Sequence, residues 1–290
     1  MFETIKSVVY HILILALSAA IALSLPYTGK FIADNYLIYW TLIEREKAFL
    51  IGVEIAVAVF LIILFNYLGS NWKNRKFSMM ARNELGLVLA TNPKSLRTKK
   101  RLKKFKEQQG TAKDVMLISS TGCNTFVNPE SDLYDVMQHC REAKILLLNP
   151  FSEGAILRTK SIPDPDITPE HFREQFTKSI DCLKSLKALQ KDIKLKLYDE
   201  TPLFKLTVLG DYIFMKYYNS GLNGHEMTEY IFIHSANHSS LFHPLYQFFL
   251  SKWRDPNIPE YDFDTDELVY KDDSGNEVKR EKLDERTTDI

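Results

Sequence analysis

Two histidines, His234 and His238, carry the side chain that most often performs acid–base or metal chemistry near neutral pH. They lie four residues apart in the segment HSANHSS. On a helix this spacing places two imidazoles on one face, but HSANHSS has the composition of a loop. Neither an HExxH motif nor a third ligand lies nearby. We expect no metal site and no cofactor, and we keep both histidines as weak catalytic candidates.

Three small polar residues, Ser119, Ser120 and Thr121, follow an apolar stretch that is typical of a buried strand. Hydroxyl groups at a strand end could line a phosphate pocket, or they could belong to an ordinary polar loop. The chain has no glycine-rich phosphate loop and no GxSxG motif for a serine nucleophile. We therefore treat the three residues as candidate ligand-binding residues.

Cysteine thiolates are the other nucleophiles to consider. Cys123 is a candidate, but the sequence places no evident base beside it. The remaining cysteines are Cys140 and Cys182, and no CxxC or paired spacing occurs. An odd number without paired spacing argues against a disulfide framework or a zinc site, so we expect free, buried thiols.

The elements that would position these residues alternate between strand and helix. Two uninterrupted apolar runs, Asp114 to Ser120 and Lys144 to Pro150, are typical of parallel strands covered on both faces. A long helix is expected from Thr168, its N-cap, to about Lys191. Four strands, with a tight turn at GDY, and a last helix follow: IKLKLYD, LFKLTVLG, YIFMKYY, TEYIFIHS and SSLFHPLYQFFLSKWRD. This order predicts an α/β domain with a mixed sheet.

The stretch from about Thr111 to Arg254 resembles a single repeat of the phospholipase D-like fold. The resemblance rests on three phrases in order: DVMLISSTGCNTF, AKILLLNPFSEGAILR and KLKLYDETPLFKLTVLGDYIFMKYY. Active members of this family carry an HxKxxxxD motif in which the histidine is the nucleophile and the lysine binds phosphate. Because two such motifs meet across a two-fold axis, the resemblance implies a homodimer or a higher homo-oligomer.

This sequence departs from the family motif at the two positions that perform the chemistry. Setting the motif aspartate on Asp211 puts Phe204 at the histidine position and Leu206 at the lysine position. A lone aspartate in a tight turn is an ordinary turn residue, so phosphodiester chemistry is not expected. Lys205 lies one position away and should point to the opposite face of its strand, where it is a candidate ligand-binding residue.

Two apolar runs near the N-terminus, Val8 to Leu25 and Leu50 to Leu68, are long enough to span a bilayer. Crossing about 30 Å of hydrocarbon takes roughly 20 helical residues. A cleaved signal peptide would have a shorter apolar core and a clear small-residue cleavage site before Pro26. The runs therefore predict a hairpin of two transmembrane helices.

Each predicted span contains one ionisable residue, His11 in the first and Glu54 in the second. Such groups are functional candidates in a membrane. In one interpretation both lie near the interfaces, with His11 neutral and Glu54 either snorkelling to the interface or hydrogen-bonded to Ser24. In the other, Glu54 lines the contact between several copies of the chain.

The formal net charge is +0, but the basic residues gather directly after the second run. By the positive-inside rule, this places both termini in the cytoplasm and the hairpin in the inner membrane. Basic side chains on a segment beside the membrane would each gain about 1 kcal/mol from an anionic leaflet. We expect this contact from Lys99, Lys100, Arg101, Lys103 and Lys104. The bilayer is thus the expected partner, and nucleic acid is not.

These patterns divide the chain into four parts. We expect a hairpin over 1–70, a basic connector over 71–110, a phospholipase D-like domain over 111–254 and an acidic, disordered tail over 255–290. The layout is similar to that of two-span effectors in bacterial signalling and anti-phage defence. It predicts a catalytically inactive protein that senses a nucleotide, another ligand or a protein partner.

Two alternatives remain open. Cardiolipin synthases also place two spans before phospholipase D-like repeats, so the chain could be a membrane-bound phosphodiesterase or phospholipid phosphotransferase with a non-standard nucleophile. It could also be a scaffold held at the membrane by its hairpin.

Overall fold

The computed structural model describes residues 2–36, 47–91, 95–110, 113–162, 164, 166–218, 227–235, 240–272 and 274–283. The chain divides into two compact units, Met1–Met79 and Met80–Ile290.

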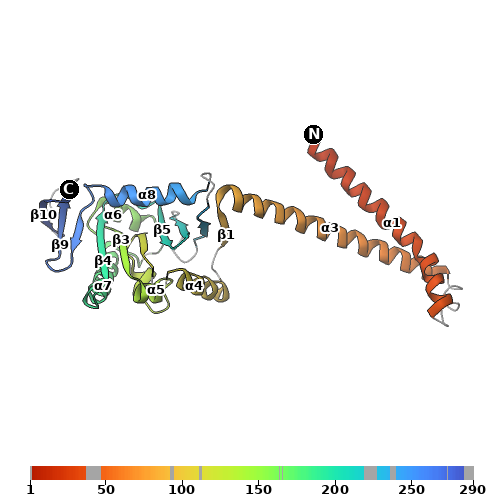
Figure 1. Ribbon diagram of the computed structural model, residues 1–290, viewed down its shortest axis with the longest axis horizontal. Helices are drawn as coiled ribbons and strands as arrows, with labels where there is room; N and C mark the ends of the chain where they lie inside the picture. The colour runs from red at the N-terminus through yellow and green to blue at the C-terminus, as the bar shows by residue number, and fades with distance from the viewer. Residues whose placement is uncertain are drawn as a thin grey trace. The chain divides into compact units, whose positions relative to one another are not determined.

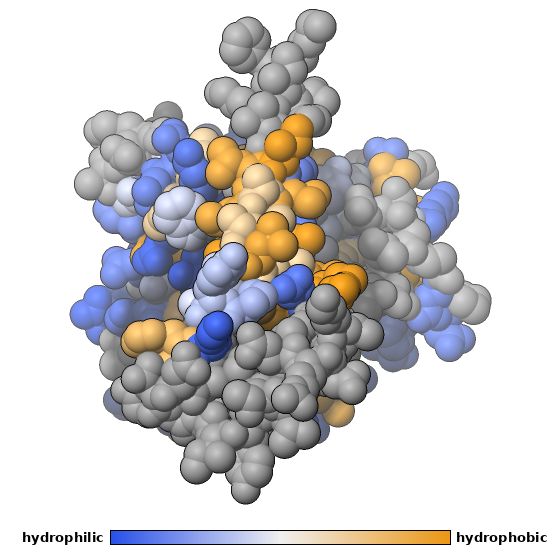
Figure 2. Space-filling view, turned by 90° about the vertical axis from the view of Figure 1, so that its right-hand side faces the viewer, coloured by the Kyte–Doolittle hydropathy of each residue, from blue (hydrophilic) through white to orange (hydrophobic). Residues whose placement is uncertain are grey.

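The first unit contains two long apolar helices, the whole of α1 (Phe2–Tyr36) and most of α3 (Lys47–Leu85). By length and composition both could span a membrane, with apolar windows at His11–Thr28 and Ile51–Leu85. Most of their large apolar side chains are exposed, as the orange surface in Figure 2 shows. α1 continues through Pro26, and α3 continues well past the expected end at Leu68.

The buried side of α1 consists of residues spaced four apart, Ile14, Ser18 and Ala22. Small residues at this spacing let two helix backbones approach closely. The Ser18 hydroxyl is buried without a hydrogen-bond partner in the described part of the chain. The Ser24 hydroxyl donates to the Ile21 carbonyl at 2.7 Å, so the structure does not show the bond to Glu54 that was one of the two options considered for this residue.

The second unit is built on one sheet of ten strands in the order β1-β7-β6-β5-β2-β3-β4-β8-β9-β10. β2, β3 and β4 run parallel, and every other neighbouring pair is antiparallel. The sheet is therefore mixed, as expected. The strands are β1 (Leu87–Thr91), β2 (Val115–Ser119), β3 (Glu142–Leu148), β4 (Asp192–Tyr198), β5 (Phe204–Leu209), β6 (Tyr212–Tyr217), β7 (Glu229–Ile233), β8 (Glu260–Asp262), β9 (Glu267–Lys271) and β10 (Glu277–Lys282).

Helices cover both faces of the sheet, with α8 on one side and α4, α5 and α7 on the other (Figure 1). Successive residues of the central strands enter opposite cores: Leu117 and Leu147 belong to one, Ile118 and Leu146 to the other. This explains the uninterrupted apolar runs. The helices are α4 (Leu96–Gly110), the π-helix η1 (Cys123–Val127), α5 (Tyr134–His139), α6 (Glu153–Lys160), α7 (Pro169–Ala188) and α8 (Phe242–Arg254).

Two local predictions are confirmed. The Thr168 hydroxyl caps α7 by accepting a hydrogen bond from the His171 amide at 3.2 Å. The expected turn joins β5 to β6 through Gly210 and Asp211, and Gly210 has a positive φ of 55° that favours glycine.

The prediction of a disordered acidic tail is wrong for residues 255–272 and 274–283. This segment forms β8, β9 and β10, and it buries Tyr261, Phe263 and Leu268 in the core. Its acids alternate with apolar residues, and several are neutralised by Arg280, which forms ion pairs with Asp262, Glu267 and Glu277. Residues 284–290 lie outside the described part.

The prediction of a separate connector is also wrong. Gly86 ends α3 with a φ of 67°, and the following residues form β1. A Cβ at Gly86 would lie 2.9 Å from the Ile233 carbonyl oxygen, so β1 starts in close contact with β7. Leu102 of α4 is buried in the core. Most of the 71–110 segment therefore belongs to the α/β unit.

Candidate ligand-binding site

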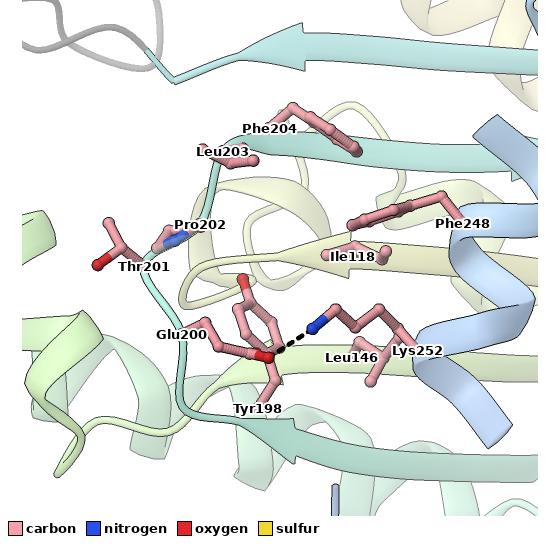
Figure 3. A pocket seen from close by; sticks show the side chains of 10 residues that line it. All are labelled: Ile118, Leu146, Tyr198, Glu200, Thr201, Pro202, Leu203, Phe204, Phe248 and Lys252. Atoms are coloured by element: carbon pink, nitrogen blue, oxygen red, sulfur yellow. Dashed lines mark hydrogen bonds and ion pairs between the residues drawn. The ribbon is translucent and has the colours of Figure 1, made fainter. Parts of the chain in front are cut away.

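A cavity of about 220 Å³ lies at the carboxyl ends of the parallel strands. Figure 3 shows it between the sheet and α8. Residues from β2, β3, β4, the β4–β5 loop, β5 and α8 line it: Ile118, Leu146, Tyr198, Glu200, Thr201, Pro202, Leu203, Phe204, Phe248 and Lys252. In α/β sheets, ligands characteristically bind outside the carboxyl ends of the strands.

The wall of the cavity is mainly apolar and aromatic. The rings of Phe204 and Phe248 have centroids 5.0 Å apart and join β5 to α8 (Figure 3). Phe204 is the residue at the histidine position of the motif considered above, and Leu206 at the lysine position is fully buried. A cavity of this size exceeds the roughly 150 Å³ that holds a benzene molecule in an engineered protein interior.

One exposed ion pair crosses the cavity. Lys252 of α8 donates to Glu200 of the β4–β5 loop at 2.5 Å (Figure 3). Their side chains are 29% and 60% exposed, so the pair contributes only about 0–1 kcal/mol. A small ligand could displace this contact without a large cost.

Tyr198, which lines the cavity, connects its wall to the polar residues at the end of β2. The Tyr198 hydroxyl donates to the Ser119 carbonyl oxygen at 3.0 Å, and burial raises the pKa of this tyrosine well above its usual value. The Ser120 amide donates to the Tyr218 hydroxyl at 3.3 Å. The Thr121 hydroxyl donates to Gln175 of α7 at 3.0 Å. The three predicted residues therefore meet at the sheet edge that forms the cavity, although none of them lines it.

A buried arginine packs against the ring of Tyr218. Arg158 of α6 is 4% exposed, and its guanidinium lies 4.5 Å from the centre of the Tyr218 ring. It donates to the Ser161 hydroxyl at 3.0 Å. Burial lowers the pKa of Arg158, and the nearby Tyr218 and Tyr198 hydroxyls partly oppose this effect. No ion pair with a carboxylate forms here among the described residues.

A cluster of charged residues lies on the opposite face of the same sheet edge. Lys106 of α4 donates to Glu229 at 2.6 Å and to Asp132 at 3.0 Å. Lys216 lies 3.4 Å from Asp132 and 3.9 Å from Glu229. Burial acts to lower the pKa of Lys106, but the two carboxylates outweigh it and hold this pKa above its usual value.

Lys205 is the uncompensated member of this cluster. It pairs with Lys216 in the β5–β6 register, so two like charges lie side by side. Burial and the charge of Lys216 lower the pKa of Lys205 to about 7, despite the attraction of Asp132. As expected, it lies on the face opposite Phe204 and Leu206. This candidate ligand-binding residue therefore does not line the cavity.

The weak catalytic candidates lie far from the cavity. Asp211 follows β5 and His234 follows β7, at the sheet edge opposite Phe204. The Asp211 carbonyl accepts from the His234 amide at 2.8 Å, and the exposed His234 ring packs against Phe242. His238 is outside the described residues. The arrangement brings neither Asp211 nor His234 to the cavity.

The cysteines are free thiols, as expected. Cys123 and Cys140 are buried, and Cys182 is half-buried. Burial raises the pKa of the Cys123 thiol, which makes it a poor nucleophile.

The basic residues of α4 divide into two groups. Lys99, Lys100, Arg101 and Lys104 are exposed. Lys103 instead forms an ion pair with Asp135 at 2.9 Å.

Sequence reasoning missed Arg158, Tyr198 and the cavity. One signal was available for Arg158: in the short helix EGAILRTK it falls on the same side as Gly154 and Ala155, which are small residues suited to close packing. The cavity itself depends on α8 crossing the sheet, which no local pattern reveals.

Comparisons with known proteins give no family. No protein-family model matches the chain, and no curated protein matches it. Among solved structures, the chain is similar to TrmBL2, an archaeal chromatin protein described as showing a novel mode of DNA binding. The match has 13% sequence identity, covers 71% of this chain and 70% of that chain, and has a TM-score of 0.33. A TM-score this low supports no conclusion about this chain.

Proposed function

We propose that this chain is a membrane-anchored ligand sensor that lacks phosphodiester chemistry. The observation that carries the proposal is the largely apolar cavity at the carboxyl ends of β2, β3 and β4. The loop and the helix that close it are held together across it by an exposed ion pair. A small molecule with an apolar part would enter there and change the contact between α8 and the β4–β5 loop.

The proposal keeps the phospholipase D-like interpretation of the second unit as a fold without its activity. Phe204 and Leu206 support this, because neither can attack phosphorus or bind phosphate. A single repeat would associate as a homodimer or a higher homo-oligomer. The enzyme alternative has less support, since His234 and Asp211 are at the edge away from the cavity.

In the same proposal α1 and α3 cross the inner membrane, with both termini in the cytoplasm. The exposed α4 residues Lys99, Lys100, Arg101 and Lys104 would lie against the anionic leaflet. Ligand binding would act on the hairpin, in the manner of two-span signalling or anti-phage effectors.

The cavity is tested with a neutral probe on the full chain in lipid nanodiscs. We expect 2-naphthol to bind, measured by naphthyl fluorescence after subtraction of empty discs. Leu203 lines the cavity and is 60% exposed, so Leu203→Trp fills the cavity at little cost to folding. Binding should be lost in this variant and kept in Leu189→Trp, a matched change at an exposed leucine at the end of α7. Equal binding by both variants contradicts the proposal.

The lack of chemistry is tested by turnover. We expect no hydrolysis of a fluorogenic phosphodiester, of labelled phosphatidylglycerol or of single-stranded nucleic acid. Turnover that disappears in a His234→Ala, His238→Ala double variant would establish the enzyme alternative instead.

A further inference from the structure

Arg158 is a buried cation with no carboxylate to balance it in the described part of the chain. An arginine side chain stays protonated in proteins even when burial lowers its pKa. Buried charges are normally paired or bound to a ligand, because removing an ion from water is costly. Here the guanidinium has one hydroxyl acceptor, Ser161, and one aromatic face, Tyr218. Among the described residues, none of its five donors has an anionic acceptor.

Arg158 also belongs to the helix, α6, that packs against the loop closing the cavity. Ala155, one helical turn before Arg158, packs in the same core cluster as Ile118, Leu146 and Tyr198, which line the cavity. Tyr198 and Arg158 interact electrostatically. A Cβ at Gly154 would lie 2.3 Å from the Asp199 carbonyl oxygen, so α6 packs directly on the β4–β5 loop that closes the cavity.

From this arrangement we infer that the ligand carries an oxyanion, a phosphate, sulfate or carboxylate, which Arg158 binds while the apolar part occupies the cavity. The planar guanidinium presents paired donors that match the oxygens of such a group. The ring of Tyr218 and the Ser161 hydroxyl hold the arginine in place. This inference rests on the proposed function and adds the chemical class of the ligand.

The test compares matched probes on the full chain in nanodiscs: 2-naphthol, 2-naphthyl phosphate and 2-naphthoate. In the wild type we expect at least one anionic probe to bind roughly tenfold more tightly than 2-naphthol, because hydrogen bonds to charged groups are the stronger ones. In Arg158→Met this preference should disappear while 2-naphthol still binds. Arg158→Lys keeps the charge without the planar donors and should give an intermediate preference. Arg254→Met, an exposed arginine at the end of α8, is the matched control and should retain the wild-type preference.

Folding provides a second readout. If Arg158 waits for an anion, then Arg158→Met removes an unbalanced charge, and the melting temperature without ligand should stay the same or rise. A clear fall in the melting temperature of Arg158→Met would show that Arg158 only completes the last turn of α6 through Ser161. This result would overturn the inference. An anion preference that persists in Arg158→Met would do the same. If the wild type does not bind 2-naphthol at all, the result would instead refute the proposal that the cavity binds a ligand.

Discussion

Lys106 connects α4 to the sheet through two carboxylates, and its side chain is 2% exposed. Lys106→Met would leave Glu229, itself 3% exposed, without this partner. Removing one member of a buried ion pair costs about 3–5 kcal/mol, because the remaining charge stays buried. We expect a loss of this size in the unfolding free energy measured by urea denaturation.

The matched control is Lys103→Met on the same helix. Lys103 pairs with Asp135, and the two side chains are 24% and 41% exposed. An exposed pair of this kind contributes about 0–1 kcal/mol. Equal losses for the two variants would show that the Lys106 cluster has no special role in stability.

Lys205 gives the α/β unit a pH-dependent stability. Its pKa is about 7 in the folded chain and 10.5 in the unfolded chain, so the unfolded chain binds more protons between these values. The free energy of unfolding should therefore rise with pH across this window. Lys205→Met removes the effect, so the variant should be more stable than the wild type at about pH 6, and its advantage should shrink by about pH 9.5.

Melting temperatures from near-ultraviolet circular dichroism measure this difference, with Lys178→Met at an exposed position of α7 as the control. A constant difference between Lys205→Met and the wild type at all pH values would mean that Lys205 does not titrate in this window.

At the residue scale, the sequence predicts which face of a strand a side chain lies on better than it predicts whether that side chain is buried. The alternation of β5 correctly separated Lys205 from Leu206. It could not reveal that Lys205 faces Lys216, because that contact depends on the β5–β6 register. Arg158 escaped prediction for a related reason: its burial comes from α6 packing on the β4–β5 loop.

The C-terminal strands β8, β9 and β10 are structural elements of the α/β unit. Tyr261, Phe263 and Leu268 are buried in the core, whereas almost every residue of β10 is exposed. A chain that ends at Arg254 should therefore aggregate or lose cooperative melting, since it exposes core surface on α7 and β4. A chain that ends at Gly275 loses β10 alone and should melt close to the wild type. Solubility and thermal melting of the two truncations test this, and equal behaviour would contradict it.

Among the elements, the strands that consist of uninterrupted apolar runs were the most predictable. β3 followed from KILLLNP because both faces of that strand are covered. β1 was not predicted, because GLVLA has no strand alternation and acquires its conformation by pairing with β7. The acidic C-terminal segment was wrongly predicted to be disordered for the opposite reason. Its strands show the alternation of apolar and polar residues, but its high charge favoured a prediction of disorder.

At the scale of the whole molecule, the two predicted spans of the proposed membrane hairpin carry one acidic residue between them, Glu54. It is half-buried on α3, and no partner for its carboxylate occurs among the described residues. A carboxyl group within a bilayer is costly unless it faces protein or water. If copies of the hairpin assemble in the membrane, Glu54 is the group that would face the contact between them.

Glu54→Gln preserves the shape of this side chain and removes its charge. If the assembled hairpin perturbs the membrane, overexpression of the wild type should slow growth, and Glu54→Gln should restore it at an equal amount of protein in the membrane fraction. Glu84→Gln is the matched control, because Glu84 is exposed in the last turn of α3, away from the predicted span. Undiminished toxicity of Glu54→Gln would exclude Glu54 from the mechanism. Loss of toxicity in Glu54→Gln alone would link the effector action to the hairpin. Variants of the ligand site could then be tested for whether ligand binding controls this action.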